Sequence, residues 1–269
     1  MKVRVCYHNQ CFDGAASAAV FSRLFLEKIN QKAEFHYTGL AHRAGKLFDE
    51  GLLDSNENAI VDFKYSSSPQ LTWWFDHHQS AFLTEADAEH FKKNKGGNKF
   101  YDPKFPSCAG LIAYVGKSQF GFQIDVLKEL LYWADIIDGA QYPDAKSAVE
   151  MKEPAIQMGL VIEASRSEKI IPELIRELTF RPLCEVATLP HIAESFNQLF
   201  EEHQKALEIL RARAVLDSGV VYFDISGEDL DTYSKFIPYY LFPQAVYCVG
   251  VSASKDRAKI AVGTNPWNS

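Results

Sequence analysis

Cysteine is scarce in this chain of 269 residues, and the few cysteines present do not form pairs. Their number is odd and their spacing shows no pairing; they are Cys6, Cys11, Cys108, Cys184 and Cys248. Small secreted scaffolds depend on an even, closely spaced set of cysteines. The sequence therefore excludes a disulfide framework and predicts reduced thiols in a cytoplasmic protein.

The chain also lacks an excess of basic residues and a long apolar run. Lys and Arg total 28 against 35 Asp and Glu, so the formal net charge is -7. A protein that coats nucleic acid needs a basic face, which this balance argues against, although a local basic pocket for a phosphorylated substrate remains compatible with it. No apolar stretch is long enough to span a bilayer. Residues 2–7 are strand-like and do not show the pattern of a signal peptide. We expect a cytoplasmic protein with no membrane partner.

The apolar content is sufficient for a sizeable core and for two domains, since 47% of the residues are hydrophobic. The first half alternates strand-like and helix-like segments. The strand-like segments are residues 3–7, 35–38, 60–63 and 71–75, and the helix-like segments are residues 14–30, 107–116 and 126–137. Such alternation predicts an α/β domain with a mostly parallel sheet and helices on both faces.

The second half has a different pattern. Apolar side chains recur at helical spacing over residues 190–213, which predicts a long amphipathic connecting helix. Strand-like runs at 220–224, 245–252 and 259–262 predict a smaller α/β domain. The expected division is a larger domain at 1–188, a connecting helix at 189–214 and a smaller domain at 215–269. The polar segment 92–99, rich in Lys, Asn and Gly, is predicted to be a solvated loop, although its charge is positive.

Ionisable side chains stand where three of the predicted strands end. His8 follows the first strand, Asp62 lies near the end of the third, and the run Asp76, His77 and His78 follows the fourth. Three polar residues directly after a buried strand are costly without partners. Because the carboxyl ends of parallel strands meet at one edge of a sheet, the pattern predicts a metal site at that edge.

Asp13 in the loop after the first strand and Asp135 in the segment 126–137 complete the candidate set. Carboxylates with some imidazole suit Mn2+ or Mg2+ better than a metal that prefers thiolates. Several carboxylates at one edge repel each other unless cations neutralise them. Two ions about 3.5–4 Å apart, bridged by one Asp, would neutralise that charge and favour the attack of water on a phosphate ester.

Each of these residues also has a structural interpretation when it is taken alone. His8 fits a histidine at the edge of the core, and Asp13 fits a helix cap. Asp62 fits a residue that caps a strand end, and Asp135 fits an exposed helix carboxylate. The run from 76 to 78 is harder to explain in this way, and the joint occurrence at strand ends favours the metal site.

In order and spacing, these residues resemble the motifs of the DHH phosphoesterase superfamily. Residues 7–18 resemble its first motif, 61–62 its second, 76–80 its third and 133–138 its fourth, while 106–110 resembles its small-residue helix start beside the site. The match covers most of the chain. The superfamily includes single-strand exonucleases, oligoribonucleases, cyclic-dinucleotide phosphodiesterases, nucleoside-bisphosphate phosphatases and exopolyphosphatases.

The resemblance implies a ligand set for two metal ions. His8 and Asp62 would hold the first ion. The second would be held by Asp13, Asp62, His77 and Asp135, so that Asp62 bridges the two. The implied cofactor is Mn2+, with Mg2+ as the alternative.

The resemblance also implies the residues that act on the substrate. His78 would contact the scissile phosphate, and Asp76 would orient the neighbouring histidines. Ser107, at the small-residue helix start, is an implied substrate contact. Residues 1–188 would then form the catalytic metal-binding domain, and 215–269 the substrate-binding domain.

The first motif departs from the family's pattern at one position. Cys11 stands where the family usually has a further aspartate. Cysteine is a softer ligand than aspartate, so Cys11 is either an additional metal ligand or a small packed residue beside the site.

The C-terminal region departs from the pattern as well. Ala253 stands where the family usually has an arginine, and the family's glycine-rich turn is either absent or lies beyond Ser269. Lys255, Arg257 and Asn265 are the candidate substrate contacts that would replace them.

These observations predict a divalent-metal-dependent phosphoesterase that hydrolyses a small phosphorylated substrate with a metal-activated water. The expected substrate is a short single-stranded oligonucleotide or a nucleotide phosphodiester. The same metal centre would serve an exopolyphosphatase or a nucleoside-bisphosphate phosphatase, and a degenerate relative would bind nucleotide without turnover. The sequence leaves open the physiological substrate, the direction of attack on a polymer and the formation of a homodimer.

Overall fold

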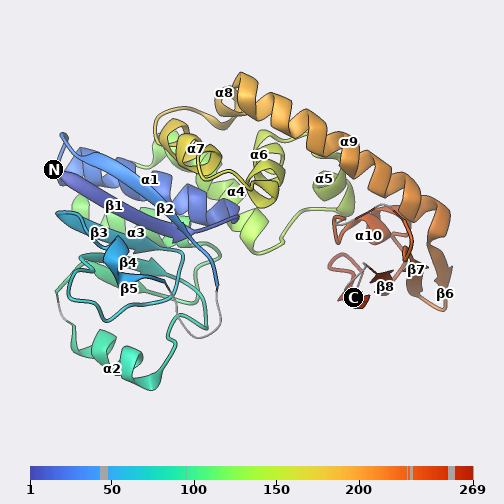
Figure 1. Cartoon of the computed structure of the whole chain (residues 1–269), viewed down its shortest axis with the longest axis horizontal. Coiled ribbons are helices and arrows are strands. Elements are labelled where there is room, and N and C mark those ends of the chain that lie inside the picture. Colours follow the sequence, from blue (N-terminus) through green and yellow to red (C-terminus); the bar gives the residue numbers. More distant parts are fainter. Residues whose placement is uncertain (43–47, 95, 229, 231–232, 254–257, 269) are drawn as a thin grey trace. The chain divides into compact units, whose positions relative to one another are not determined.

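The structure of the protein is a computed structural model that describes residues 1–42, 48–94, 96–228, 230, 233–253 and 258–268 (Figure 1). It divides into two compact units. Unit 1 comprises Met1–Gln141 and Met158–Leu189, and unit 2 comprises Tyr142–Gln157 and Pro190–Ser269. Lys95 of the polar loop and the predicted substrate contacts Lys255 and Arg257 lie outside the described residues.

Unit 1 is built on a parallel sheet with the strand order β2-β1-β3-β4-β5. Its strands are β1 (Lys2–His8), β2 (Glu34–Leu40), β3 (Glu57–Val61), β4 (Trp73–Asp76) and β5 (Lys99–Tyr101). All of the strand pairs are parallel, so the carboxyl ends lie at one edge. The predicted α/β class with a parallel sheet is confirmed.

Helices cover one face of this sheet. Helix α1 (Phe12–Lys28) packs on β1 and β3 and against α3 (Cys108–Phe120), α4 (Lys128–Asp138) and α7 (Ile170–Leu178). Phe21 of α1 lies with its ring 5.7 Å from that of Trp73 and 6.0 Å from that of Phe75. Unit 1 also contains η2 (Asp125–Leu127), α8 (Leu183–Ala187) and the later part of α6 (Pro154–Ala164), whereas α5 (Ala145–Glu150) belongs to unit 2.

The other face of the sheet is covered mainly by connecting segments. Ile60 and Trp74 pack there in an apolar cluster with Tyr65. Phe91 of α2 (Glu85–Lys93) and Leu52 of η1 (Glu50–Leu52) pack against that cluster. Both faces therefore carry helices, as the alternating pattern predicted, but on this face they are short.

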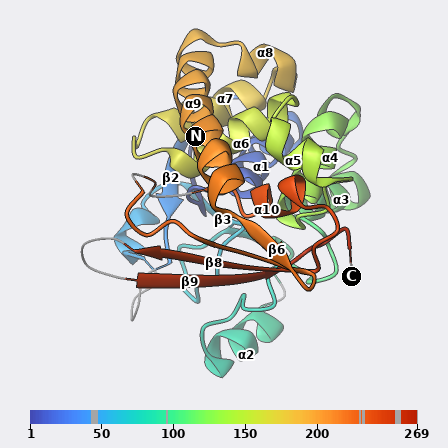
Figure 2. The same cartoon turned by 90° about the vertical axis from the view of Figure 1, so that its right-hand side faces the viewer.

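Unit 2 begins its main segment with the long helix α9 (Pro190–Arg213), whose bounds match the predicted ones. A four-stranded mixed sheet follows, with the order β6-β7-β8-β9. The strands are β6 (Val215–Asp217), β7 (Val220–Asp224), β8 (Tyr247–Ala253) and β9 (Ala258–Thr264), with α10 (Ile237–Leu241) between β7 and β8. Figure 2 shows β8 and β9 side by side, where they pair antiparallel. No helix in the described part of the chain is both long and apolar enough to cross a membrane.

Residues 142–157 belong to unit 2, although the expected division assigned them to the larger domain. The indole of Trp267 donates a hydrogen bond of 2.7 Å to the carbonyl of Tyr142. The ring of His203 on α9 lies 2.8 Å from the carbonyl of Val149. These bonds tie a segment that precedes α9 to elements that follow it, a pairing that local sequence patterns do not encode.

The connection from β1 to α1 depends on Gly14. A Cβ atom at this position would lie 2.2 Å from the carbonyl oxygen of His8. That distance is far below van der Waals contact, and the obstacle is backbone that a rotamer change cannot move. The absence of a side chain at Gly14 therefore lets the first turn of α1 approach the end of β1 and the His8 side chain.

We expect Gly14→Ala to destabilise unit 1 by about 1–3 kcal/mol, because the added methyl group forces the backbone of β1 and α1 apart. Gly159 in α6 is the matched control, since a Cβ there meets nothing within 4 Å. Gly159→Ala should stabilise the protein by about 0.5–1 kcal/mol. Urea unfolding followed by tryptophan fluorescence measures both, and equal effects of the two substitutions would contradict this account.

Candidate metal centre

The carboxyl edge of the unit 1 sheet gathers the ionisable residues that the motifs contain. His8 is the last residue of β1, and Asp76 is the last residue of β4. Asp62 directly follows β3, while His77 and His78 directly follow β4. The parallel topology brings these residues together, as expected from their positions at strand ends.

Asp62 is at the centre of the cluster. Its side chain is fully buried, with Oδ2 3.4 Å from Nδ1 of His8 and Oδ1 3.5 Å from Nε2 of His77. Its backbone has φ 56°, in the left-handed region that few residues other than glycine adopt. The Asp62 amide is held by a 2.9 Å bond to the carbonyl of Phe75 on the next strand. The two carboxylate oxygens thus face two different histidines.

His77 links Asp62 to a second set of carboxylates. Its Nε2 lies 3.6 Å from Oδ2 of Asp13 and 3.4 Å from Oδ2 of Asp138. Its Nδ1 lies 3.0 Å from the carbonyl of Phe105, which fixes the ring and leaves Nε2 toward the acids. A ligating histidine in proteins commonly has its other nitrogen held in this way.

Asp13 is fixed by the start of helix α3. Its carboxylate accepts hydrogen bonds from the amides of Cys108 at 2.7 Å and Ala109 at 3.0 Å. These amides belong to the first turn of α3, where the helix dipole favours negative charge. Asp13 therefore does cap a helix, as considered from the sequence, but that helix is α3 and not the helix that contains Asp13. The same carboxylate also faces His77.

Asp76 fixes the orientation of the His78 ring through a contact with its Nδ1 atom. Oδ1 of Asp76 accepts bonds from the amides of His77 at 2.9 Å and His78 at 3.2 Å, and lies 2.7 Å from Nδ1 of His78. Asp76 is fully buried, whereas the His78 side chain is 35% exposed. The proton on Nδ1 is therefore directed to Asp76, which fixes the orientation of the His78 ring.

The cluster contains buried polar atoms that no hydrogen bond satisfies within the described residues. These atoms are Nδ1 of His8, both carboxylate oxygens of Asp62, Oδ2 of Asp76 and Nε2 of His77. A buried polar atom without a partner costs about 1–3 kcal/mol, so a group of them at one place requires an explanation. Divalent cations would satisfy these atoms, because carboxylate and imidazole are ligands that Mn2+ and Mg2+ accept in proteins.

The ligand atoms fall into groups in which all atoms lie within 4.8 Å of one another. The groups are His8 with Cys11 and Asp62, Asp62 with His77 and His78, and Asp13 with His77 and Asp138. Asp62 and His77 are each shared between groups. The donor set therefore fits more than one divalent ion.

The electrostatics of the cluster show how strongly its charges interact. Burial alone would raise the pKa of Asp62, but the rings of His77 and His8 outweigh it and lower the pKa to about 2. Burial alone would lower the pKa of His77, but Asp62 and Asp13 raise it to about 10. Burial and the neighbouring Asp62 raise the pKa values of Asp13 and Asp138. Without an ion, the cluster would thus retain protons that neutralise part of its charge.

Helix α4 contributes Asp138 to the cluster where Asp135 was expected. Asp135 instead accepts a hydrogen bond from the hydroxyl of Ser107 and does not belong to any of the described ligand groups. Asp138, one turn later, places Oδ2 beside His77. Both residues lie in the motif-like segment 133–138, and their spacing of three puts them on the same helix face. The predicted segment therefore lies at the cluster, where Asp138, and not Asp135, is the carboxylate beside His77.

Two of the expected substrate contacts have structural roles. Ser107 is buried and caps α3, accepting a 3.0 Å bond from the amide of Gly110 while it donates to Asp135. Asn265 is 2% exposed, and its amide donates to the carbonyls of Pro243 and Ala245. Because both side chains are committed to internal partners, we correct the expectation that they contact substrate.

His42 lies beside the centre, although no sequence pattern singled it out. Its ring centroid lies 5.1 Å from that of His8 and 4.7 Å from that of Phe63. Burial and the nearby His8 lower its pKa. It follows β2, and only the pairing of β2 with β1 brings it to His8.

Comparison with known proteins shows which fold this is. No family model matches the chain, and no curated protein sequence matches it. Among solved structures, the pGpG-specific phosphodiesterase PggH from Vibrio cholerae matches with a TM-score of 0.73 and 16% identity, over 99% of this chain and 84% of that one. RecJ from Thermus thermophilus, in complex with Mn2+, matches with a TM-score of 0.51 and 12% identity, over 96% of this chain and 44% of that one.

Both of these structures belong to the DHH superfamily. The chain therefore has the DHH fold, as its motifs predicted. The likeness extends over nearly the whole chain, and thus over both units.

We expect the binding of Mn2+ to release protons and to strengthen as the pH rises. Because the pKa of His77 is raised to about 10, its ring is protonated at neutral pH in protein stripped of metal, and an ion must displace that proton. Calorimetric titration in two buffers of different ionisation enthalpy counts the released protons. An affinity that stays constant from about pH 6.5 to about pH 8.5 would contradict this description of the site.

Proposed function

We propose that the protein is a divalent-metal-dependent phosphoesterase that hydrolyses a short oligonucleotide or a nucleotide phosphodiester. The observation that carries this proposal is the buried Asp62 carboxylate, whose two unsatisfied oxygens face two separate groups of ligands. A carboxylate shared between two ligand groups is the arrangement that a two-metal hydrolytic centre requires.

The geometry supports the following ligand assignment. His8 and Asp62 would hold one ion, and Asp62, His77, Asp13 and Asp138 would hold the other. When bound, such ions supply an activated water and neutralise the charge on the phosphoryl oxygens. Mn2+ is the proposed ion, with Mg2+ as the alternative, because the donor set consists mainly of hard oxygen ligands with imidazole.

His78 is the proposed contact to the scissile phosphate. The hydrogen bond to Asp76 raises the pKa of His78, so the ring retains its proton more readily than a free histidine does. With Nδ1 held by Asp76, Nε2 can donate to a phosphoryl oxygen and stabilise the charge that develops there. Asp76 acts on the reaction through His78, as a positioning residue.

Cys11 is proposed as an additional ligand of the His8 group. It precedes the first residue of α1, and its sulfur lies within 4.8 Å of the ligand atoms of His8 and Asp62. Burial and the neighbouring Asp62 raise the pKa of the thiol, so an adjacent cation is needed before it can serve as a thiolate. Cys11 would therefore bind only in concert with an ion that the other residues already hold.

The substrate class is supported by the fold neighbours. PggH is described as specific for pGpG, a dinucleotide, and the other neighbour is crystallised with Mn2+. On this basis we propose that a short oligonucleotide is the substrate of the present protein and that Mn2+ is its cofactor. Unit 2 is the proposed substrate-binding part.

We expect Asp62→Asn to reduce the bound Mn2+ from two ions per chain to one or none. It should lower kcat/KM at least about a thousandfold, or about 4 kcal/mol of transition-state stabilisation. Asparagine tolerates the left-handed backbone and has the same shape, so the fold should persist. Elemental analysis after gel filtration and steady-state kinetics provide the readouts. Near-full activity with two bound ions would rule out the bridging role.

We expect metal-dependent release of products from one member of a substrate panel. The panel contains a dinucleotide, a five-nucleotide RNA, a nucleoside 3′,5′-bisphosphate, a cyclic dinucleotide and polyphosphate, each assayed with Mn2+ and with chelator. The proposal expects cleavage of the dinucleotide, the short RNA or the cyclic dinucleotide. Turnover of polyphosphate or the bisphosphate alone would overturn the proposed substrate class but keep the metal centre.

The control for this panel compares two histidines. His77→Ala should abolish turnover, because it removes a ligand shared between groups. His36→Ala should leave turnover unchanged, because His36 is exposed on the edge strand β2. Equal loss of activity in both variants would show that the activity does not depend on the cluster. If the folded wild-type protein released no product from any substrate, a protein that binds nucleotide without turnover would be favoured.

A further inference from the structure

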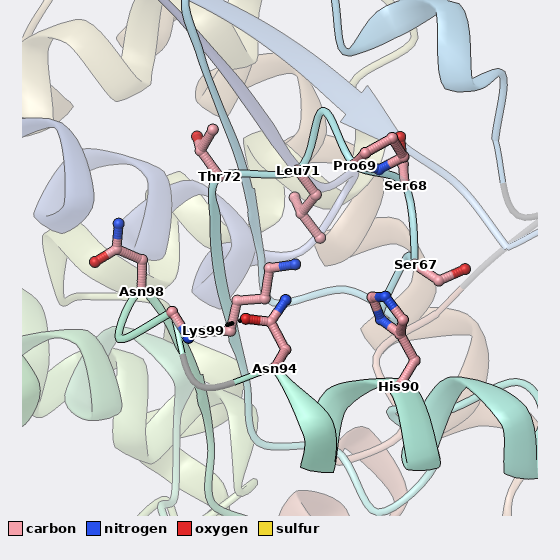
Figure 3. A pocket seen from close by; sticks show the side chains of 10 residues that line it. Ser67, Ser68, Pro69, Leu71, Thr72, His90, Asn94, Asn98 and Lys99 are labelled. Carbon is pink, nitrogen blue, oxygen red and sulfur yellow. Dashed lines mark hydrogen bonds between the residues drawn. The ribbon is translucent and has the colours of Figure 1, made fainter.

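A polar cavity lies at the opposite edge of the unit 1 sheet from the metal centre. It has a volume of about 240 Å³ and is shown in Figure 3. Thr72, directly before β4, and Lys99, the first residue of β5, belong to its wall, so it opens at the amino ends of these strands. None of the metal-centre residues lines it.

Three nitrogen donors converge on this cavity. In Figure 3 the amino group of Lys99, the amide nitrogen of Asn94 and the ring of His90 are directed toward one another below Leu71. Oδ1 of Asn94 accepts a 3.1 Å bond from the amide of Gly96, which identifies the other end of that side chain as the donor. These groups come from two separate segments, the end of α2 and the start of β5.

Tyr65 holds these donors in position from the core. Its ring is fully buried and lies 4.8 Å from the ring of Trp74. Its hydroxyl lies 2.8 Å from Nδ1 of His90 and 3.5 Å from Nζ of Lys99. With Nδ1 of His90 engaged in this way, Nε2 is left for a ligand. A set of donors anchored by a buried residue loses little conformational entropy when a ligand binds.

The wall of the cavity carries the positive charge of Lys99 and no described carboxylate. Among the described residues that line it there is no Asp or Glu, although the chain as a whole has a formal charge of -7. The half-buried Lys99 makes no ion pair within the described residues; it lies 5.4 Å from the centre of the Tyr65 ring. Burial alone lowers the pKa of Lys99, with no acidic group acting on it. An anion would supply the missing countercharge.

We infer that this cavity binds a phosphate group, supplied either by inorganic phosphate or by a small phosphorylated metabolite. A lysine acting as a point charge together with several N–H donors matches the many acceptor oxygens of a phosphate. The volume is below the range of about 300–1,000 Å³ that is typical of pockets for larger ligands, so the phosphate itself is the part enclosed. The inference does not depend on the proposed hydrolytic activity.

The experiment is calorimetric titration of inorganic phosphate into chelator-treated full-length protein at matched ionic strength. The chelator prevents phosphate from binding through metal ions. The wild type should show saturable binding of one phosphate per chain. Lys99→Met, which keeps the aliphatic stem but removes the charge, should weaken binding at least tenfold. Lys104→Met, the control at an exposed lysine just after β5, should change it less than twofold.

A second measurement does not require a variant to fold. In the imidazole NMR spectrum of the wild-type protein, phosphate should shift the His90 resonances and leave those of His36 in place. Saturable binding without a shift at His90, equal weakening by both lysine substitutions, or no saturable binding would each overturn the inference. Titration with a nucleoside 5′-monophosphate distinguishes the sources: at least tenfold tighter binding identifies a nucleotide, and equal affinity identifies phosphate alone.

Discussion

The concentration of negative charge around the buried Asp62 carboxylate is the constraint on which the rest of the site depends. Asp13, Asp62 and Asp138 all approach His77, and two of the three are fully buried. Such an arrangement is unstable unless positive charge enters it, from protons or from metal ions. The surrounding structure consequently fixes each member of the cluster by backbone contacts. Examples are the α3 amides at Asp13 and the Phe105 carbonyl at His77.

The same constraint separates the histidines by role. His77 is buried and faces carboxylates on several sides, so its free nitrogen is available to a cation. His78 is partly exposed and its Nδ1 lies 2.7 Å from Oδ1 of Asp76, which fits the proposed contact of its other nitrogen with a phosphate. The difference arises from the end of β4, after which the His77 ring is buried among carboxylates and the His78 ring, although also bonded to Asp76, is partly exposed.

Much of the fold could be predicted because it follows periodic patterns. The apolar repeat of α9 predicted its bounds, and the strand-helix alternation predicted the parallel sheet. Strand β5 has only three residues beside a polar loop and carries no such pattern. The assignment of residues 142–157 to unit 2 depends on bonds to Trp267 and His203, which are far away in the sequence. Long-range contacts of this kind decide boundaries that local propensity cannot.

The site was predictable to the extent that strand ends determine it. His8, Asp62 and the run from 76 to 78 each end a strand or follow one directly, and the sheet assembles them. The choice between Asp135 and Asp138 depends on the position of α4 along its axis, which sequence spacing does not specify. Ser107 and Asn265 are small polar residues beside turns, where internal capping competes with ligand binding. The phosphate cavity arises from packing around Tyr65 and has no sequence signature.

The backbone at Asp62 has a consequence for which residues this position can accommodate. A φ of 56° is tolerated by glycine, asparagine and aspartate and disfavours longer or β-branched side chains. The bridging of two ligand groups requires a negatively charged side chain with two oxygen atoms, which only aspartate and glutamate provide. Aspartate is the one amino acid that meets both requirements. Any substitution of Asp62 would therefore lose either the fit to the backbone conformation or the negative charge.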